Sequence, residues 1–368
     1  MLNWMLVFVP IAILMELFAA GQHLLVFLAA ALAIVPLAGW LGHATEHLAE
    51  RSGEGVGGLL NATFGNATEL IIALSAMRAG LHDVVKASIV GSIVGNILLV
   101  LGAAMLAGGL RHQEQQYNAL AARSQATLLT LAAIALVLPA AYNAVVSARA
   151  PHGLQALSLY ISLVLLLVYG LFLLYSLVTH KNLFSGDSSA PRDAHGAALW
   201  PTGKALLVLA MATMMIAGIS EILVAAIEPS ARQLGLSNLF VGVFIVAILG
   251  NAAEHSSAIS AAMKNRMDLS LAIAIGSSVQ VALFVAPVLV LASYLISSAP
   301  MDLAFSGGLV LSVLLAVLIS GQVVGDGRSD WLKGMQLMAV YLILGRPTSL
   351  HRMFRFSEPA RRGRRSTA

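Results

Sequence analysis

The sequence predicts an all-α polytopic membrane protein of about eleven transmembrane helices, built as two inverted five-helix repeats plus an extra N-terminal helix. Three observations predict this fold: an apolar composition, a series of apolar runs long enough to cross a bilayer, and a gap-free internal repeat. Hydrophobic residues make up 59% of the 368 residues, charged residues make up 10%, and the mean hydropathy is +0.87. Because a soluble domain carries about 25% charged residues, we expect almost the whole chain to lie in the membrane.

The apolar runs follow one another with short polar connections, and most approach the roughly 20 residues that a transmembrane helix requires. The first run lacks the basic segment of a signal peptide, so we expect it to be retained as a helix. The last run is short and weak. The runs occupy residues 3–20, 24–46, 57–77, 87–110, 124–146, 154–178, 204–227, 238–262, 270–297, 303–324 and 331–346.

A polar stretch rich in Gly, Ser, Pro and Asp interrupts the series and predicts a solvated linker. Five runs precede this linker after the first one, and five follow it. The expected divisions are an N-terminal extra transmembrane helix at 1–23, a first five-helix repeat at 24–180, a cytoplasmic linker at 181–203, a second five-helix repeat at 204–346 and a basic C-terminal tail at 347–368.

The distribution of Lys and Arg indicates the orientation. These residues are more frequent in the connections on the side of the linker than on the opposite side, so the positive-inside rule predicts a cytoplasmic linker, in what we expect to be a bacterial inner membrane. Eleven full spans would place the basic tail outside, unless residues 331–346 form a re-entrant segment. The formal net charge of +4 arises largely in that tail, which indicates lipid contact or disorder rather than nucleic-acid binding.

The internal repeat is carried by two copies of one motif. Residues 65–92 align with residues 250–277 without a gap, at a constant offset of 185 residues. The matches include Gly-Asn and Glu, which chance similarity between Ala-rich and Leu-rich helices would not produce. Because each half holds an odd number of spans, the second copy must enter the membrane from the opposite side. Inverted repeats of this kind are typical of secondary transporters, whose binding sites lie at the midplane between the repeats.

Each copy of the motif predicts half of a cation site. Gly and Asn favour a break in a helix and so free backbone carbonyls. Asn66 and Glu69 stand three residues apart, as do Asn251 and Glu254, so each pair shares a helix face. An acid deep in a membrane span is functional by default, because burying its charge is costly. A second polar group follows on the next span of each half: Ser92 and Asn96, and Ser277 and Gln280.

Two further acids occupy corresponding places in the spans before the motifs, Glu46 and Glu221. Glu221 has apolar flanks on both sides, which favours a functional role, whereas Glu46 could lie at the membrane interface. Glu46 also belongs to the segment His43-Ala44-Thr45-Glu46-His47, which matches the H-x-x-E-H motif of a class of zinc hydrolases. An intramembrane zinc hydrolase using His43, Glu46 and His47 is therefore a remote alternative, although it explains neither the repeat nor Glu69 and Glu254.

The paired motifs resemble those of the calcium/cation antiporter superfamily, and specifically of its cation/proton exchanger branch. The second segment of that family reads Gly-Asn-Ala-x-Glu-His, matched by 250–255, followed by Gly-Ser-Ser-x-Gln, matched by 276–280. The resemblance covers nearly the whole chain. It implies eleven helices, an outlying first helix and exchange of Ca²⁺ for H⁺, with no enzyme activity and no cofactor beyond the transported ion. One departure is that the linker lacks the strongly acidic helix of eukaryotic members, which favours a bacterial-type exchanger.

The resemblance assigns roles to individual residues. Glu69 and Glu254 would bind the cation, with supporting oxygens from Asn66, Asn251, Ser92, Ser277 and Gln280. Glu46 and Glu221 would have proton-linked roles, and His255 would modulate the site. The substrates would be Ca²⁺ and H⁺. A Na⁺/Ca²⁺ exchanger or a Na⁺(K⁺)/H⁺ antiporter on the same scaffold remains an open alternative.

Overall fold

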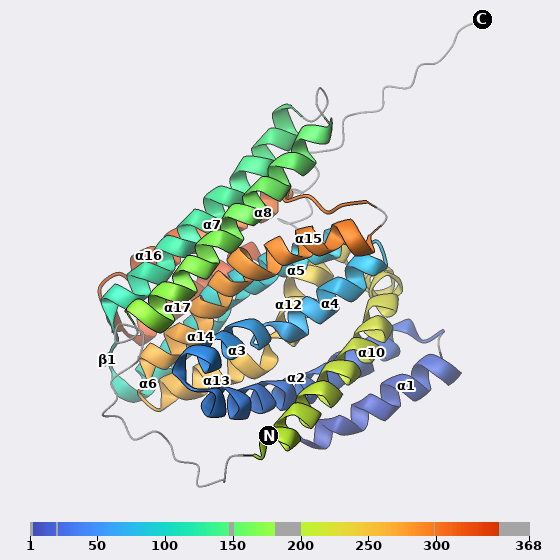
Figure 1. Ribbon diagram of the computed structural model, residues 1–368, viewed down its shortest axis with the longest axis horizontal. Helices are drawn as coiled ribbons and strands as arrows, with labels where there is room; N and C mark the ends of the chain where they lie inside the picture. Colours follow the sequence, from blue (N-terminus) through green and yellow to red (C-terminus); the bar gives the residue numbers. More distant parts are fainter. Residues whose placement is uncertain (1–2, 20, 147–150, 181–199, 298, 346–368) are drawn as a thin grey trace, which may run out of the picture.

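The computed structural model describes residues 3–19, 21–146, 151–180, 200–297 and 299–345, and these residues are almost entirely helical (Figure 1). Most of the expected linker and the whole expected basic tail at 347–368 lie outside the described residues. The elements before the linker are η1 (Asn3–Val7), α1 (Phe8–Phe18), α2 (His23–Ser52), α3 (Glu54–Phe64), α4 (Ala67–Arg78), α5 (His82–Val94), η2 (Gly95–Val100), α6 (Leu101–His112), β1 (Gln115–Gln116), α7 (Ala119–Val145), α8 (Pro151–Leu174) and η3 (Tyr175–Thr179).

The elements after the linker repeat the same series. They are α10 (Thr202–Leu234), α11 (Asn238–Phe240), η4 (Val241–Val246), α12 (Ala247–Gly250), α13 (Ala252–Met263), α14 (Met267–Gln280), η5 (Val281–Val285), α15 (Ala286–Ile296), α16 (Gly307–Val323), β2 (Arg328–Ser329) and α17 (Trp331–Leu344). With the offset of the repeat, α3 corresponds to α11, η4 and α12 together, α4 corresponds to α13, and α5 corresponds to α14. Every predicted apolar run coincides with a helix or with a consecutive set of helices.

Among the described residues, 6 helices are long and apolar enough to cross a membrane, and the bent pair Asn238–Gly250 and Ala252–Met263 makes a seventh span. Three further apolar helices are shorter, at Asn3–Phe18, Gly307–Val323 and Trp331–Leu344. The polytopic all-α fold is therefore confirmed. The number of eleven complete spans stays a prediction, since the shorter helices do not reach membrane-spanning length by themselves.

The predicted helix breaks occur at both Gly-Asn motifs. Helix α3 ends at Phe64 and α4 begins at Ala67, while α12 ends at Gly250 and α13 begins at Ala252 with a bend of 62°. In each half the Asn adopts a non-helical conformation, with φ of −100° at Asn66 and −103° at Asn251. Each Glu lies in the first turn after its break, near a helix N-terminus. The break thus places both acids at the inner ends of helices that lie inside the bundle.

The helices form two groups around these broken elements. Figure 1 shows α1, α2 and α10 gathered along one side of the molecule, with α7, α8, α16 and α17 on the opposite side. Helices α2 and α10 pack along each other, and α6 packs against α17. The α6–α17 crossing depends on a close approach between Gly102 and Gly334, because a Cβ at Gly334 would lie 2.6 Å from the Gly102 carbonyl oxygen.

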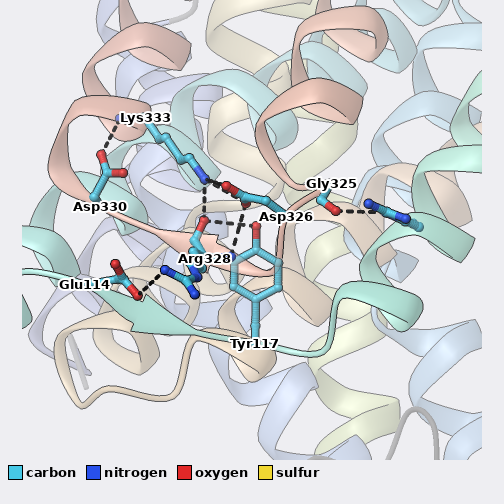
Figure 2. A network of polar contacts seen from close by, with 8 residues as sticks. Glu114, Tyr117, Gly325, Asp326, Arg328, Asp330 and Lys333 are labelled. Carbon is cyan, nitrogen blue, oxygen red and sulfur yellow. Dashed lines mark hydrogen bonds and ion pairs between the residues drawn. The ribbon is translucent and has the colours of Figure 1, made fainter.

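Three loops on the linker side of the molecule are joined by polar contacts. Strand β1 pairs antiparallel with β2, with Gln115 opposite Ser329. The Gln115 amide donates to the Ala262 carbonyl at 2.8 Å, which adds the end of α13 to the same group. Figure 2 shows Lys333 and Asp326 pointing toward each other between α16 and α17. The Lys333 ammonium donates to both Asp326 oxygens, at 2.7 and 2.6 Å, and to the Arg328 carbonyl at 2.7 Å.

We expect Lys333→Met to lower the apparent Tm of the purified protein by only about 1–2 °C at neutral pH, because Asp326 is exposed and a solvent-exposed ion pair contributes little. The hydrogen bond from Lys333 holds the pKa of Asp326 below its ordinary value of 3.8. A carboxyl group with a depressed pKa in the folded state stabilises the fold above its unfolded pKa, and this contribution is lost as the pH falls. The difference in Tm between the wild type and the variant should therefore shrink as the pH is lowered through about 4. A difference that is unchanged at pH 3 would contradict this role of the ion pair.

Candidate cation site between the two repeats

The two repeated glutamates lie in the interior, near the two helix breaks, between α3 and α4 and between α12 and α13. Glu69 is in the first turn of α4 and Glu254 is in the first turn of α13. Both side chains are partly buried, and Glu69 Oε2 and Glu254 Oε2 are each buried without a hydrogen-bond partner among the described residues. A buried carboxylate oxygen without a donor is costly. A bound cation or a proton could satisfy both oxygens.

The surroundings of Glu69 come from both halves of the chain. Ser92 of α5 donates to Glu69 Oε1 at 2.5 Å, and the Asn251 amide donates to the same oxygen. Asn251 also lies 3.2 Å from Ser92 Oγ and 3.1 Å from the Ala247 carbonyl oxygen. The Asn of one motif thus contacts the Glu of the other, where the sequence indicated a pair within one motif. The helix break explains the difference, because it turns each Asn away from the helix that carries its own Glu.

Glu254 has a different set of neighbours, although the motifs are alike. Ser277 is the hydroxyl group beside its carboxylate. The Asn66 amide, which corresponds to that of Asn251, donates to Gln280 Oε1 at 2.5 Å, and Asn66 Oδ1 accepts from Ser277 Oγ at 3.1 Å. Gln280 corresponds to Gly95 of the first half. Because Gly95 has no side chain, the first half has no equivalent of the hydrogen bond between Asn66 and Gln280.

The remaining polar group of the interior connects η2, α13 and α14. The Asn96 amide donates to Ser277 Oγ at 3.2 Å, and Asn96 Oδ1 lies 2.9 Å from His255 Nε2. The structure therefore brings together Glu69, Glu254, Asn66, Asn251, Ser92, Ser277, Gln280 and His255, with Asn96 in addition. Asn96 was not among the expected ligands, although the sequence indicated it as the polar partner of Ser92 on the same span.

Glu46 and Glu221 do not join this cluster in the structure. The Glu46 carboxylate lies 3.3 Å from His43 Nδ1, and 64% of its side chain is exposed. Glu221 forms an ion pair with Arg78 at 3.0 Å, across α10 and α4. The His47 ring stacks on the ring of Trp200, with centroids 4.6 Å apart. Among the described residues no group of three or more His, Asp or Glu side chains could hold a metal ion.

Three π-helical turns flank the cluster and were not indicated by the sequence. Turn η2 begins at Gly95, η4 ends four residues before Gly250, and η5 begins directly after Gln280. Short π-helical turns are rare and are frequent at functional sites, because the extra residue changes the direction of neighbouring side chains. A pocket beside Glu69 is lined by Ile72, Ser88, Ser92 and Val285, among others.

Comparison with known proteins assigns the chain to a family. The model of the sodium/calcium exchanger protein family matches residues 22–178 and 204–344, which cover both halves of the repeat. The chain belongs to this family. It is an integral membrane protein and a transporter rather than an enzyme, which leaves no support for the zinc-hydrolase alternative on His43, Glu46 and His47.

Curated relatives cover nearly the whole length of the chain. The chain is 44% identical over 355 residues to the Ca²⁺/H⁺ antiporter of Aphanothece halophytica, covering 93% of this chain and 94% of that protein. It is 42% identical over 312 residues to the Ca²⁺/H⁺ antiporter ChaA of Bacillus subtilis, covering 84% and 88%. These relatives confirm the resemblance to the cation/proton exchanger branch that the paired motifs indicated.

Solved structures agree with the fold. The structure of native YfkE superposes with a TM-score of 0.77 at 38% identity, covering 94% of this chain and 97% of that chain. The structure of the H⁺/Ca²⁺ exchanger CAX has a TM-score of 0.69 at 17% identity, covering 93% and 86%, and so supports the fold alone.

Proposed function

We propose that this protein exchanges Ca²⁺ for H⁺ across a bacterial inner membrane, with the linker in the cytoplasm, by alternating access to one site that contains Glu69 and Glu254. The observation that carries this proposal is the pair of buried carboxylate oxygens, one from each inverted half, that have no hydrogen-bond partner in the described part of the chain. Relatives that match nearly the full length of the chain are named Ca²⁺/H⁺ antiporters, which supports the same substrates. No cofactor is needed beyond the transported ion.

The polar cluster suits a hard divalent cation. Ca²⁺ prefers six to eight oxygen ligands at roughly 2.3–2.6 Å, from carboxylates, amides and hydroxyls. Two carboxylates would neutralise its charge. The amide or hydroxyl oxygens that could complete the shell come from Asn66, Asn251, Ser92, Ser277 and Gln280, once their present mutual hydrogen bonds rearrange.

Exchange follows from charge balance at this site. When Ca²⁺ leaves, two negative charges remain close together in a region poor in water, and protons replace the lost cation. The described residues around the two acids supply hydroxyl and amide groups but no Lys or Arg that could neutralise them. We expect that the site cannot switch from one side of the membrane to the other while both carboxylates are charged and no cation is bound. Ca²⁺ can then move in one direction only when H⁺ moves in the other.

Transport by the purified protein in liposomes tests this proposal. We expect an acidic interior to drive Ca²⁺ uptake in the absence of Na⁺, as measured with an entrapped Ca²⁺-sensitive dye. Collapse of the pH gradient with an ionophore should stop the uptake. Uptake that requires a Na⁺ gradient would instead support a Na⁺/Ca²⁺ exchanger, and dissipation of the pH gradient by Na⁺ or K⁺ without Ca²⁺ movement would support a monovalent cation antiporter.

A further inference from the structure

A small cavity lies beside Glu69, on the side of this residue that faces the turn between α4 and α5. Its walls come from α4 and α5 of the first half and from η4, α12 and η5 of the second half. Ile72 and Ala73 belong to the turn of α4 that follows Glu69, and Ser88 lies one turn of α5 before Ser92. The cavity has room for about one water molecule.

The polar side chains that line this cavity present hydrogen-bond acceptors to it. Glu69 Oε2 is buried and has no hydrogen-bond partner among the described residues. The Ser88 hydroxyl donates its hydrogen to the Val85 carbonyl oxygen at 2.9 Å, so its oxygen can only accept a hydrogen bond from within the cavity. Ser92 in turn donates its hydrogen to Glu69 Oε1 at 2.5 Å. The Glu69 carboxylate and the two hydroxyl groups therefore have no hydrogen left to donate to a guest.

This pattern of acceptors determines which guest fits the cavity. The other walls are apolar and are formed by Ile72, Ala73, Ile89, Val246, Val281 and Val285, among others. A cation inside the cavity would meet too few oxygens, since Ca²⁺ takes roughly six to eight. A water molecule donates two hydrogen bonds, and it suits two acceptors such as Glu69 Oε2 and Ser88 Oγ. Its own lone pairs then stay free to bind a cation held by the carboxylates.

The second half of the repeat differs at this position. The offset of 185 residues makes Ser277 the counterpart of Ser92, and Ile273 the counterpart of Ser88. The Ile273 side chain has no hydrogen-bonding atom, so α14 cannot hold a water molecule beside Glu254 in the way that α5 can beside Glu69. The two glutamates carry the same charge, but their surroundings provide different oxygens.

We propose that Ser88 holds a water molecule against Glu69 Oε2, and that this water is one of the oxygen ligands of the transported divalent cation. Ser88 is then a positioning residue, which acts on the cation through the water. This inference rests on the proposed function, since it adds a ligand to that same site. It also gives Ser88 a role that the paired Gly-Asn-Ala-x-Glu motifs do not indicate.

The variants Ser88→Thr and Ser88→Val test the role of the hydroxyl group. Their side chains have nearly the same shape, and in a helix the Thr hydroxyl can donate to a preceding carbonyl as Ser88 does. We expect Ser88→Val to raise the KM for Ca²⁺ in liposome exchange about tenfold or more, with the maximal rate unchanged, because groups that orient metal ligands contribute 10–100-fold to affinity. Ser88→Thr should stay close to the wild type. A packing role would affect both variants alike, and equal KM values would overturn the proposal.

The water itself can be counted with Eu³⁺, a hard cation that takes oxygen ligands as Ca²⁺ does. Its luminescence decays at different rates in H₂O and D₂O, and the difference gives the number of water molecules bound to the ion. The measurement uses the purified protein in detergent and the Eu³⁺ that Ca²⁺ displaces. We expect at least one bound water in the wild type and in Ser88→Thr, and one fewer in Ser88→Val. No bound water in the wild type, or the same number in Ser88→Val, would overturn the water ligand.

These measurements separate the water ligand from the proposed function. A wild type that exchanges Ca²⁺ for H⁺, with equal KM values in the two Ser88 variants, would overturn the water ligand alone. Absence of proton-driven Ca²⁺ uptake by the wild type would count against the proposed function, whereas a loss of one Eu³⁺-bound water in Ser88→Val would still support the water beside Glu69.

Discussion

Replacement of Glu69 or Glu254 by Gln is expected to lower Ca²⁺/H⁺ exchange by a factor on the order of 100 or more, since loss of groups that merely orient metal ligands already costs 10–100-fold. Gln keeps the size of the side chain but removes the charge that balances Ca²⁺ and the site that takes up a proton. The two variants should insert and purify like the wild type, because each buried oxygen at present lacks a partner that the substitution would remove. Liposome transport under an acidic interior measures the effect.

Glu16→Gln is the matched control for these variants. It makes the same change in the apolar helix α1, away from the polar cluster, and should leave exchange unchanged. Full exchange by both Glu69→Gln and Glu254→Gln would contradict the assignment of the site. Loss of exchange in Glu16→Gln as well would indicate that the assay reports insertion or folding rather than ion binding.

Gly91→Ala is expected to lower exchange at least about tenfold and to reduce the apparent Tm, since overfilling a packed core typically costs about 1–3 kcal/mol. The added methyl group would lie 2.2 Å from the Val243 carbonyl oxygen and 2.7 Å from its carbonyl carbon. Both atoms are backbone, so the substitution must push η4 away from α5. Because η4 continues into α12 and the Gly250–Asn251 break, this movement would displace Asn251 from Glu69.

Gly95→Ala provides the control for Gly91→Ala. Gly95 lies four residues further along the same span, and a Cβ there has nothing within 4 Å. This variant should exchange Ca²⁺ and melt like the wild type, so any loss specific to Gly91→Ala reports the contact with η4. Wild-type exchange by Gly91→Ala would show that the α5–η4 contact is not needed for the geometry of the site.

The helical architecture was largely predictable from the sequence, because the bilayer imposes strong rules on composition and length. Each apolar run became a helix or a consecutive set of helices, and both helix breaks occurred at Gly65-Asn66 and Gly250-Asn251. The gap-free repeat also placed the two glutamates in one cluster. These features depend on local propensity and on the inverted topology, and both can be read from residue types and spacing.

The contacts within the cluster could not be predicted in the same way. The pairing of Asn251 with Glu69, and of Asn66 with Gln280, depends on how the broken helices cross in space. The ion pair of Glu221 with Arg78 joins residues far apart in the sequence, and it gives Glu221 a basic partner that its apolar flanks did not indicate. Helix α3 packs against α2 and η3, whereas its counterpart η4 packs against α5, and the gap-free repeat does not indicate this difference.

In the proposed mechanism Ca²⁺ and H⁺ compete for the carboxylates of Glu69 and Glu254. The most direct measurement is the number of protons released when Ca²⁺ is added to the purified, weakly buffered protein in detergent, followed by calorimetry in two buffers of different ionisation enthalpy. We predict that Ca²⁺ binding releases protons in the wild type and that the release disappears in the double variant Glu69→Gln/Glu254→Gln. Ca²⁺ binding without proton release in the wild type, or an undiminished release in the double variant, would contradict the claim.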